Sequence, residues 1–193
     1  MDDRLVAWAR RVKRRRGGPP PLWLFTDRAR LADPCEAAAR LPRGLAGVVL
    51  REECAPDRAA LGARLARICR ARRLMLVVAG DWRLAAVLGA GLHLRGGRWP
   101  VGAGRTRLVT SSAHSASELR RALSTGAGVV FLSPAFATLS HPGAPSLGPL
   151  RWRALARAAP SWGWGRVAAL GGIDGTTVRR LGCRIAGAIG ALG

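Results

Sequence analysis

The chain has 193 residues, 49% of them hydrophobic, which predicts one globular domain with a core of its own and excludes a disordered chain. The formal net charge is +21, but Lys13 is the only lysine among the 32 basic residues and tyrosine is absent, a composition typical of a GC-rich genome. Apart from residues 10–16, the arginines fall at helical spacing among alanines and leucines. This spacing favours solvated helix faces and an anionic small ligand over a nucleic acid.

We expect neither a membrane span, nor a signal peptide, nor a cysteine motif from this sequence. No apolar run reaches the ~18 residues of a membrane helix, and the charged N-terminus does not resemble a signal peptide. We therefore expect a cytoplasmic protein with no membrane partner. The cysteines form no Cys-x-x-Cys pair, which argues against a zinc site or a disulfide framework and favours buried free thiols. They are Cys35, Cys54, Cys69 and Cys183.

Residues 2–16 have one apolar stripe and a basic last turn, which predicts a basic N-terminal helix in a unit of residues 1–18. Residues 19–193 form the second predicted unit. Eight apolar runs in it predict buried strands: 22–26, 45–50, 74–78, 91–94, 108–110, 129–132, 167–170 and 185–189. Helical spacing, caps or a proline at the first turn predict helices between them: 33–40, 59–71, 82–88, 115–123, 150–158 and 176–181.

The order of these elements predicts the fold class. Strand and helix alternate eight times, and the strands are continuously apolar, as strands buried on both faces are. Eight repeats in this length predict an α/β protein with a parallel (β/α)8 TIM barrel, an extra N-terminal helix and a truncated last helix. An open doubly wound sheet is the alternative. The N-terminal helix or a partner, including a second copy in a homo-oligomer, is then expected to cover the barrel where the last helix is missing.

Polar residues follow several strands, and in such a barrel they meet at the carboxyl ends of the strands. A loop over residues 133–148 carries hydroxyls and an imidazole, and loops of this length are usually functional or disordered. One group predicts an anion site through side chains: Arg51, Ser112, Thr138, Ser140 and His141. A second group predicts a phosphate site through backbone N–H groups: Gly171, Gly172, Ile189 and Gly190.

Each of these residues also has a structural explanation that the sequence leaves open. Gly171 and Gly172 are alternatively a simple turn, and Arg51 alternatively pairs with an adjacent glutamate. His114 is alternatively a helix-start residue, and Asp81 alternatively caps the helix that begins at residue 82. His93 alternates with apolar residues, so we interpret it as a buried barrel histidine rather than a ligand.

Six segments, in order, resemble motifs of the thiamine-phosphate synthase / TenI family. They are Leu24–Arg28 (L-x-T-D-R in the family), Val48–Glu53 (V-Q-L-R-E-K), Gly89–Leu94 (G-A-D-G-V-H-L), residues 112–118 (S-x-H-x-x-x-E), residues 133–148 (G-P-x-F-P-T-x-T-K…L-G) and Ala169–Ile173 (A-I-G-G-I). The resemblance spans residues 22–192. No single motif is decisive, but the ordered set is specific.

The resemblance implies a transferase that joins a hydroxymethylpyrimidine pyrophosphate to a thiazole phosphate in thiamine biosynthesis, with Mg²⁺ as cofactor. By position it assigns Arg51, Ser112 and His114 to catalysis. It assigns pyrophosphate to Arg51 and Ser112 together with Thr138 and Ser140 of the loop, and the thiazole phosphate to Gly171, Gly172, Ile189 and Gly190. His141 of the loop is a further candidate for binding substrate or phosphate. Asp81 is the remaining candidate for the metal. The expected partners are phosphorylated pyrimidine and thiazole molecules.

The sequence departs from the family pattern where the metal is expected. Ala79 and Gly80 stand at the family's Asn-Asp pair, with Asp81 one position late, and residues 95–98 (Arg-Gly-Gly-Arg) replace its Gly-Gln and metal-binding aspartate. Val49 and Glu53 replace a glutamine and a lysine, His141 replaces the loop lysine, and Pro134 stands where the tautomerase branch has a histidine. The alternative hypothesis is therefore a non-catalytic or repurposed relative that binds a phosphorylated small molecule. A nucleic-acid-binding protein is less expected.

Overall fold

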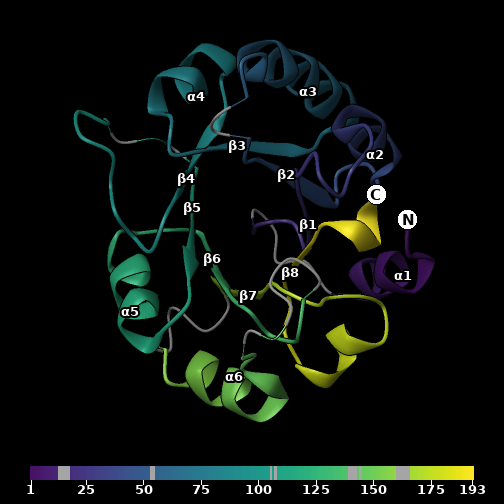
Figure 1. Cartoon of the computed structure of the whole chain (residues 1–193), viewed down its shortest axis with the longest axis vertical. Coiled ribbons are helices and arrows are strands. Elements are labelled where there is room, and N and C mark those ends of the chain that lie inside the picture. The colour runs from purple at the N-terminus through teal and green to yellow at the C-terminus, as the bar shows by residue number, and fades with distance from the viewer. Residues whose placement is uncertain are drawn as a thin grey trace.

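The computed structural model describes residues 1–12, 18–52, 55–104, 106, 108–138, 143, 145–159 and 166–193. Eight strands pair in parallel and in chain order, and β8 pairs with β1, so the sheet closes into a barrel (Figure 1). The strands are β1 (Leu22–Phe25), β2 (Ala46–Leu50), β3 (Met75–Ala79), β4 (Gly91–Leu94), β5 (Val109–Ala113), β6 (Val129–Leu132), β7 (Val167–Ala169) and β8 (Ala186–Ala188). The predicted closed parallel barrel is confirmed.

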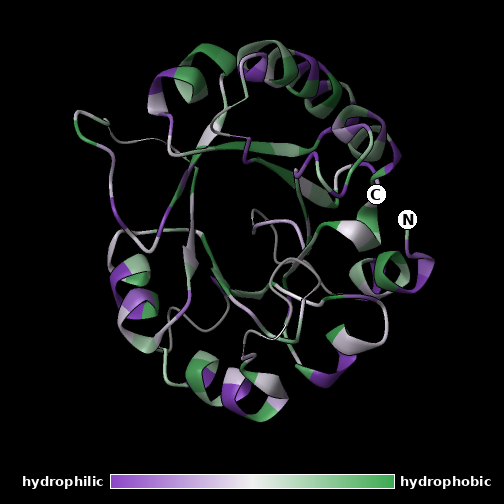
Figure 2. Cartoon of the chain, viewed as in Figure 1, coloured by the Kyte–Doolittle hydropathy of each residue, from purple (hydrophilic) through white to green (hydrophobic). Residues whose placement is uncertain are grey.

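Helices surround this barrel. They are α1 (Asp3–Arg11), α2 (Pro34–Arg40), α3 (Arg58–Arg72), α4 (Trp82–Leu88), α5 (Ala116–Ser124) and α6 (Gly148–Arg157), with 3-10 turns η2 (Thr177–Arg180) and η3 (Gly190–Leu192). The strands are mostly hydrophobic, whereas the helices carry both kinds of residue (Figure 2). No helix in the described part of the chain is long and apolar enough to cross a membrane.

Helix α1 is shorter than predicted. The sequence predicts a helix to residue 16, but α1 ends at Arg11, and Val12 has an extended backbone. The buried stripe of α1 consists of Leu5, Val6 and Ala9. Because a short helix depends on packing for its stability, we attribute its end to the end of that stripe. Residues 13–16 of the predicted helix lie outside the described residues.

Helix α1 lies in the ring between η2 and α2, where a helix after β8 would otherwise stand (Figure 1). The Met1 amino group donates to the Gly193 carbonyl at 2.9 Å, and the Asp2 N–H donates to Ala191 at 2.7 Å. The Asp2 carboxylate accepts from the N–H groups of Arg4 and Leu5, which caps the helix, and from Gly175 after β7. The N-terminal helix therefore covers the barrel beside β8.

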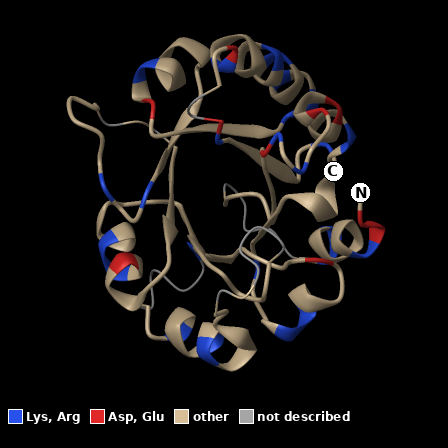
Figure 3. Cartoon of the chain, in the orientation of Figure 1, with Lys and Arg blue, Asp and Glu red and all other residues tan. Residues whose placement is uncertain are grey.

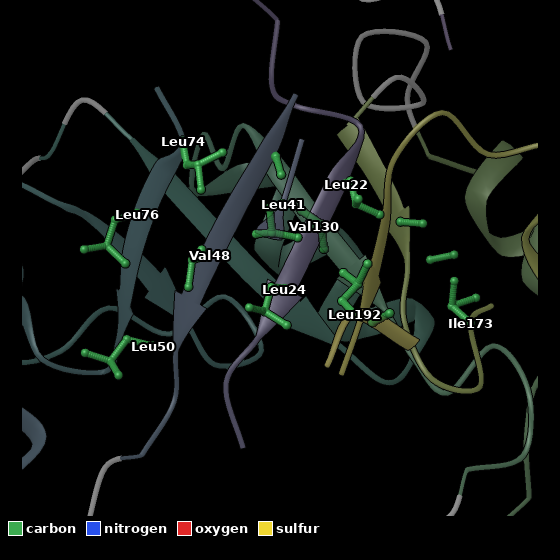
Figure 4. Packing of buried hydrophobic residues seen from close by; sticks show 14 of the residues in the cluster. Leu22, Leu24, Leu41, Val48, Leu50, Leu74, Leu76, Val130, Ile173 and Leu192 are labelled. Carbon is green, nitrogen blue, oxygen red and sulfur yellow. The ribbon is translucent and has the colours of Figure 1, made fainter. Parts of the chain in front are cut away.

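The core has an outer and an inner part. The outer part fills the space between strands and helices, and Figure 4 shows residues such as Leu24, Val48 and Leu76 along the strands. The inner part fills the barrel, where Phe25 and Phe131 pack edge to face with ring centroids 4.7 Å apart. Its buried members are Trp23, Phe25, Val49, Val77, Val129, Phe131, Ala168 and Ile185.

Strand β5 is longer than predicted. The expected strand ended at Thr110, but β5 runs to Ala113 through three hydroxyl residues. Thr110 and Ser111 are fully buried, and their hydroxyls bond to His93 and to the Leu94 carbonyl of the adjacent strand. Buried hydroxyls are tolerated when they are hydrogen-bonded, and sequence patterns do not show those partners.

Candidate functional site

The carboxyl ends of all eight strands meet at one end of the barrel, because every pairing is parallel. Side chains alternate along a strand, and Val49 of β2 belongs to the inner core. The same alternation directs Arg51, Arg95, Ser112 and Ser133 toward the barrel axis at the ends of β2, β4, β5 and β6. We call the open end of the barrel at the carboxyl ends of the strands, where these four residues lie, the mouth.

His93 lies inside the barrel below the mouth. Its ring is 4% exposed, contacts Phe25 edge-on at 5.7 Å between centroids, and shares a 2.8 Å hydrogen bond between Nδ1 and the Thr110 hydroxyl. Burial, together with the smaller effect of the Arg51 and Arg95 charges, lowers the pKa of His93 to about 3. His93 is thus a neutral core residue, and the mouth above it is cationic.

Arg51 is held in place through its backbone. Its N–H donates to the hydroxyl of the fully buried Thr26 at 2.9 Å, and that hydroxyl also contacts the Glu52 carboxylate. Among the described residues, no ion pair joins Arg51 to Glu52. The alternative that Arg51 pairs with an adjacent glutamate is therefore not observed for Glu52. Glu53 lies outside the described part of the chain. The exposed guanidinium of Arg51 is therefore not neutralised by Glu52.

Asp27, after β1, is a carboxylate whose pKa responds to the charge of Arg51. It forms a 2.6 Å ion pair with Arg30. Burial alone would raise the pKa of Asp27, but the hydrogen bond and charge of Arg30, together with the charge of Arg51, outweigh it and lower the pKa. Asp27 is thus ionised and paired on the rim.

Residues 95–98 form a tight turn that carries two arginines. The Arg98 N–H donates to the Arg95 carbonyl at 3.0 Å, with Gly96 at φ +53° and Gly97 at φ +73°. A Cβ on Gly97 would lie 2.6 Å from the Ala122 nitrogen of α5. Only glycine fits this approach, and the turn is clamped by a 2.6 Å hydrogen bond from Arg121 Nε to the Gly96 carbonyl.

Two of the predicted catalytic residues lie on the β5 side. The Ser112 hydroxyl accepts a long 3.4 Å hydrogen bond from Gly96 N–H. His114 is exposed, and its Nδ1 lies 3.2 Å from the Ser133 hydroxyl and 3.3 Å from the Ser133 carbonyl. Its backbone N–H donates to the Glu118 carboxylate at the start of α5, so His114 is also a helix-start residue. We did not predict Ser133 as a site residue, although it stands at the glycine of the family's loop motif.

The long loop packs on the end of β7. The Ala135 and Phe136 N–H groups donate to the carbonyls of Leu170 and Gly171 at 2.8 and 3.0 Å. A Cβ on Gly171 would lie 3.2 Å from the Thr138 methyl group, which places Thr138 beside the glycine pair. Ser140 and His141 lie outside the described residues. Of the predicted loop residues, Thr138 is therefore the one that the structure locates.

The glycine pair after β7 forms a turn that requires glycine and, among the described residues, leaves two backbone N–H groups open. Gly171 and Gly172 have φ values of +93° and +63°, and a Cβ on Gly172 would lie 2.5 Å from the Ala137 carbonyl oxygen. Within the described part of the chain, the N–H groups of both glycines have no hydrogen-bond acceptor. Two adjacent open N–H groups are an anion-binding arrangement. Ile189 and Gly190 follow β8, where Ile189 packs on the inner core and Gly190 begins η3.

Asp81, the predicted metal ligand, has structural partners. One carboxylate oxygen caps α4 by accepting from the Leu84 N–H at 2.9 Å, and the other lies 3.6 Å from Arg58 Nη1. Arg58, which we did not predict, also donates to the Ala79 carbonyl at 2.5 Å. These residues line a cavity of about 510 Å³ over β3, whose wall consists of Arg58, Ala79, Gly80, Asp81, Trp82, Arg83, Pro100 and Val101.

The described residues contain no group of three or more His, Cys, Asp or Glu side chains that could hold a metal ion. Mg²⁺ prefers near-octahedral oxygen coordination, usually with one or two carboxylates. Here one carboxylate is engaged by a helix N-terminus and an arginine, and an arginine-bearing turn follows β4. The described residues therefore do not fit a magnesium site.

Comparison with known proteins identifies the family. The model of the thiamine monophosphate synthase family matches residues 22–190. The chain belongs to the thiamine monophosphate synthase family. No curated protein matches the chain.

Solved structures of this family share the fold. Thiamine phosphate pyrophosphorylase from Pyrococcus furiosus is 22% identical with a TM-score of 0.69, and the match covers 87% of this chain and 84% of that one. The protein of the same name from Bacteroides thetaiotaomicron is 19% identical with a TM-score of 0.58, covering 89% and 83%. At these identities the likeness to the two structures concerns the fold alone.

Proposed function

We propose that the chain is a thiamine-phosphate-synthase-like transferase that joins a hydroxymethylpyrimidine pyrophosphate to a thiazole phosphate. The family match supports this class of reaction. The observation that supports the proposal is that two different features suited to anions lie at one end of the barrel. They are the arginines above His93 and the open N–H groups of Gly171 and Gly172.

The two features lie on opposite sides of the mouth. Arg51 and Arg95 follow β2 and β4, which flank β3, and β7 stands four strands from β3 in the closed order of eight. Two substrates that each carry a phosphate group would thus have these groups held apart, with their reacting atoms over the barrel axis. Such positioning accelerates a reaction between two bound substrates.

The chemistry requires stabilisation of one leaving group. The bond between the pyrimidine methylene carbon and the pyrophosphate oxygen breaks, and its electron pair leaves with pyrophosphate. The thiazole nitrogen then donates its lone pair to that carbon, which forms the new C–N bond and gives thiamine phosphate. Arg51 and Arg95 supply positive charge where the leaving oxygen becomes negative, and Gly171 and Gly172 orient the thiazole phosphate.

The test is formation of thiamine phosphate from the two phosphorylated substrates by the purified protein. We expect turnover in the wild type and a loss of about 100-fold or more in kcat/KM for Arg51→Ala. Arg67→Ala is the matched control, because it removes the same charge from the exposed face of α3. Equal rates for Arg51→Ala and wild type would contradict the proposed role of Arg51.

A second candidate is a repurposed relative that binds a phosphorylated small molecule without catalysis. The engagement of Asp81 by Leu84 and Arg58 favours it, because the chain lacks the carboxylate set that the family resemblance implies. Binding of thiazole phosphate that is weakened by Gly172→Ala, with no thiamine phosphate formed, would support this candidate over the transferase.

A further inference from the structure

The family resemblance implies a divalent cation, but the donor atoms of this chain argue against one. Neither oxygen of the Asp81 carboxylate is free, since Leu84 N–H and Arg58 bind one each. Arg98 stands at the position of the family's metal-binding aspartate, which reverses the charge there. A bound Mg²⁺ would have to displace a helix cap and lie near arginines.

Positive charge is supplied by two side chains instead. Arg51 and Arg95 extend from β2 and β4 in the inward register, each two residues beyond an inner residue, Val49 and His93. This register places both side chains above His93, and the positive charge of each lowers the pKa of that buried ring. Guanidinium groups bind phosphate oxygens in pairs of parallel hydrogen bonds and remain charged at any physiological pH.

The backbone fixes both arginines. The Thr26 hydroxyl anchors Arg51 through its N–H at 2.9 Å. Arg95 begins the turn that closes through Gly96 and Gly97, which is pinned to β5 by a 3.0 Å hydrogen bond from the Gly97 N–H to the Ser111 hydroxyl. Backbone positions fixed in this way need not be ordered when a ligand binds, which reduces the entropic cost of binding.

We propose that the mouth holds the diphosphate group of its ligand without a divalent cation, through Arg51 and Arg95. The inference rests on the proposed function for the identity of the ligand. It adds that this chain differs from the metal-dependent chemistry that its family implies, and that Arg95 is a ligand-binding residue.

The test is calorimetric titration of inorganic pyrophosphate into the full chain, in the presence of EDTA and separately with Mg²⁺ in excess. We expect the wild type to bind pyrophosphate in EDTA at least as tightly as with Mg²⁺. Loss of a charge-assisted contact should weaken binding by about 10-fold to 100-fold in Arg51→Ala and Arg95→Ala. Arg95→Lys keeps the charge but not the planar guanidinium group, so its affinity for pyrophosphate should lie between those of Arg95→Ala and the wild type. Arg67→Ala should bind as the wild type does.

Several results would overturn the inference. They are binding only when Mg²⁺ is present, no binding in either condition, and wild-type affinity in both alanine variants. Circular dichroism and thermal unfolding of each variant separate lost contacts from lost fold. Pyrophosphate bound in EDTA without formation of thiamine phosphate would support this inference and overturn the transferase, whereas turnover that requires Mg²⁺ would do the reverse.

Discussion

The buried imidazole of His93 makes the stability of the barrel depend on pH. In the folded chain the pKa of His93 is lowered to about 3 from its ordinary 6.5, first by burial and then by Arg51 and Arg95. Between pH 6.5 and about 3, His93 is therefore mostly protonated in the unfolded chain and mostly neutral in the folded chain. Since the unfolded state binds more protons, the free energy of unfolding falls as pH falls from 6.5 toward 3.

The size of the effect follows from this pKa difference. Between about pH 8 and about pH 5, protonation of His93 in the unfolded state should lower the free energy of unfolding by about 2 kcal/mol. Asp27 and Asp174 have lowered pKa values, so their contributions are present above the ordinary value of 3.8 and are lost only below it. The stability changes due to Asp27 and Asp174 therefore fall below the chosen pH range, and His93 is the group that the measurement addresses.

Urea denaturation of wild type and His93→Gln at the two pH values measures the effect. Glutamine keeps a polar group for the Thr110 hydroxyl but does not titrate, so the wild type should lose about 2 kcal/mol more than the variant. If His93→Gln fails to fold, NMR of the wild-type ring provides the second measurement, and the ring should stay neutral down to about pH 5. An imidazole that titrates near 6.5, or an identical pH dependence in both proteins, would refute the reasoning.

Three further predictions concern the scaffold. Asp2→Ala removes the cap of α1 and should lower the free energy of unfolding by about 1–2 kcal/mol in urea denaturation, whereas Asp3→Ala, at an exposed position, should cost less. Gly172→Ala forces a side chain into φ +63° and against a carbonyl, so we expect about 1–3 kcal/mol of destabilisation, and a variant as stable as wild type would contradict that crowding. Burial raises the pKa of Cys69 and Cys183 to about 12, so in the native protein at about pH 8 both should resist iodoacetamide, which peptide mass spectrometry checks.

Part of the site followed from local sequence. Arg51 and the glycine pair follow strands that are recognisable as apolar runs, and a parallel barrel brings the carboxyl ends of its strands together. Arg58 was missed because it begins a helix with no unusual pattern, and its contact with Asp81 joins residues 23 positions apart. Ser133 was visible only as a departure from a motif glycine, and its partner His114 is 19 positions away.

The sequence by itself determined the class of fold, because apolar periodicity and turn residues are local properties that each segment displays alone. It also determined the family, through short motifs in a fixed order. Only the tertiary structure decided that α1 ends at Arg11 and covers the barrel beside β8, since both depend on which surface the Leu5 stripe can bury. It alone decided that Asp81 is engaged by Arg58 and that Arg51 and Arg95 both follow strands in the inward register above His93. The reason is that the pairing of distant segments depends on strand register and closure rather than on any local pattern. The spread of basic residues over helices around the whole ring was likewise visible only once the chain was folded (Figure 3).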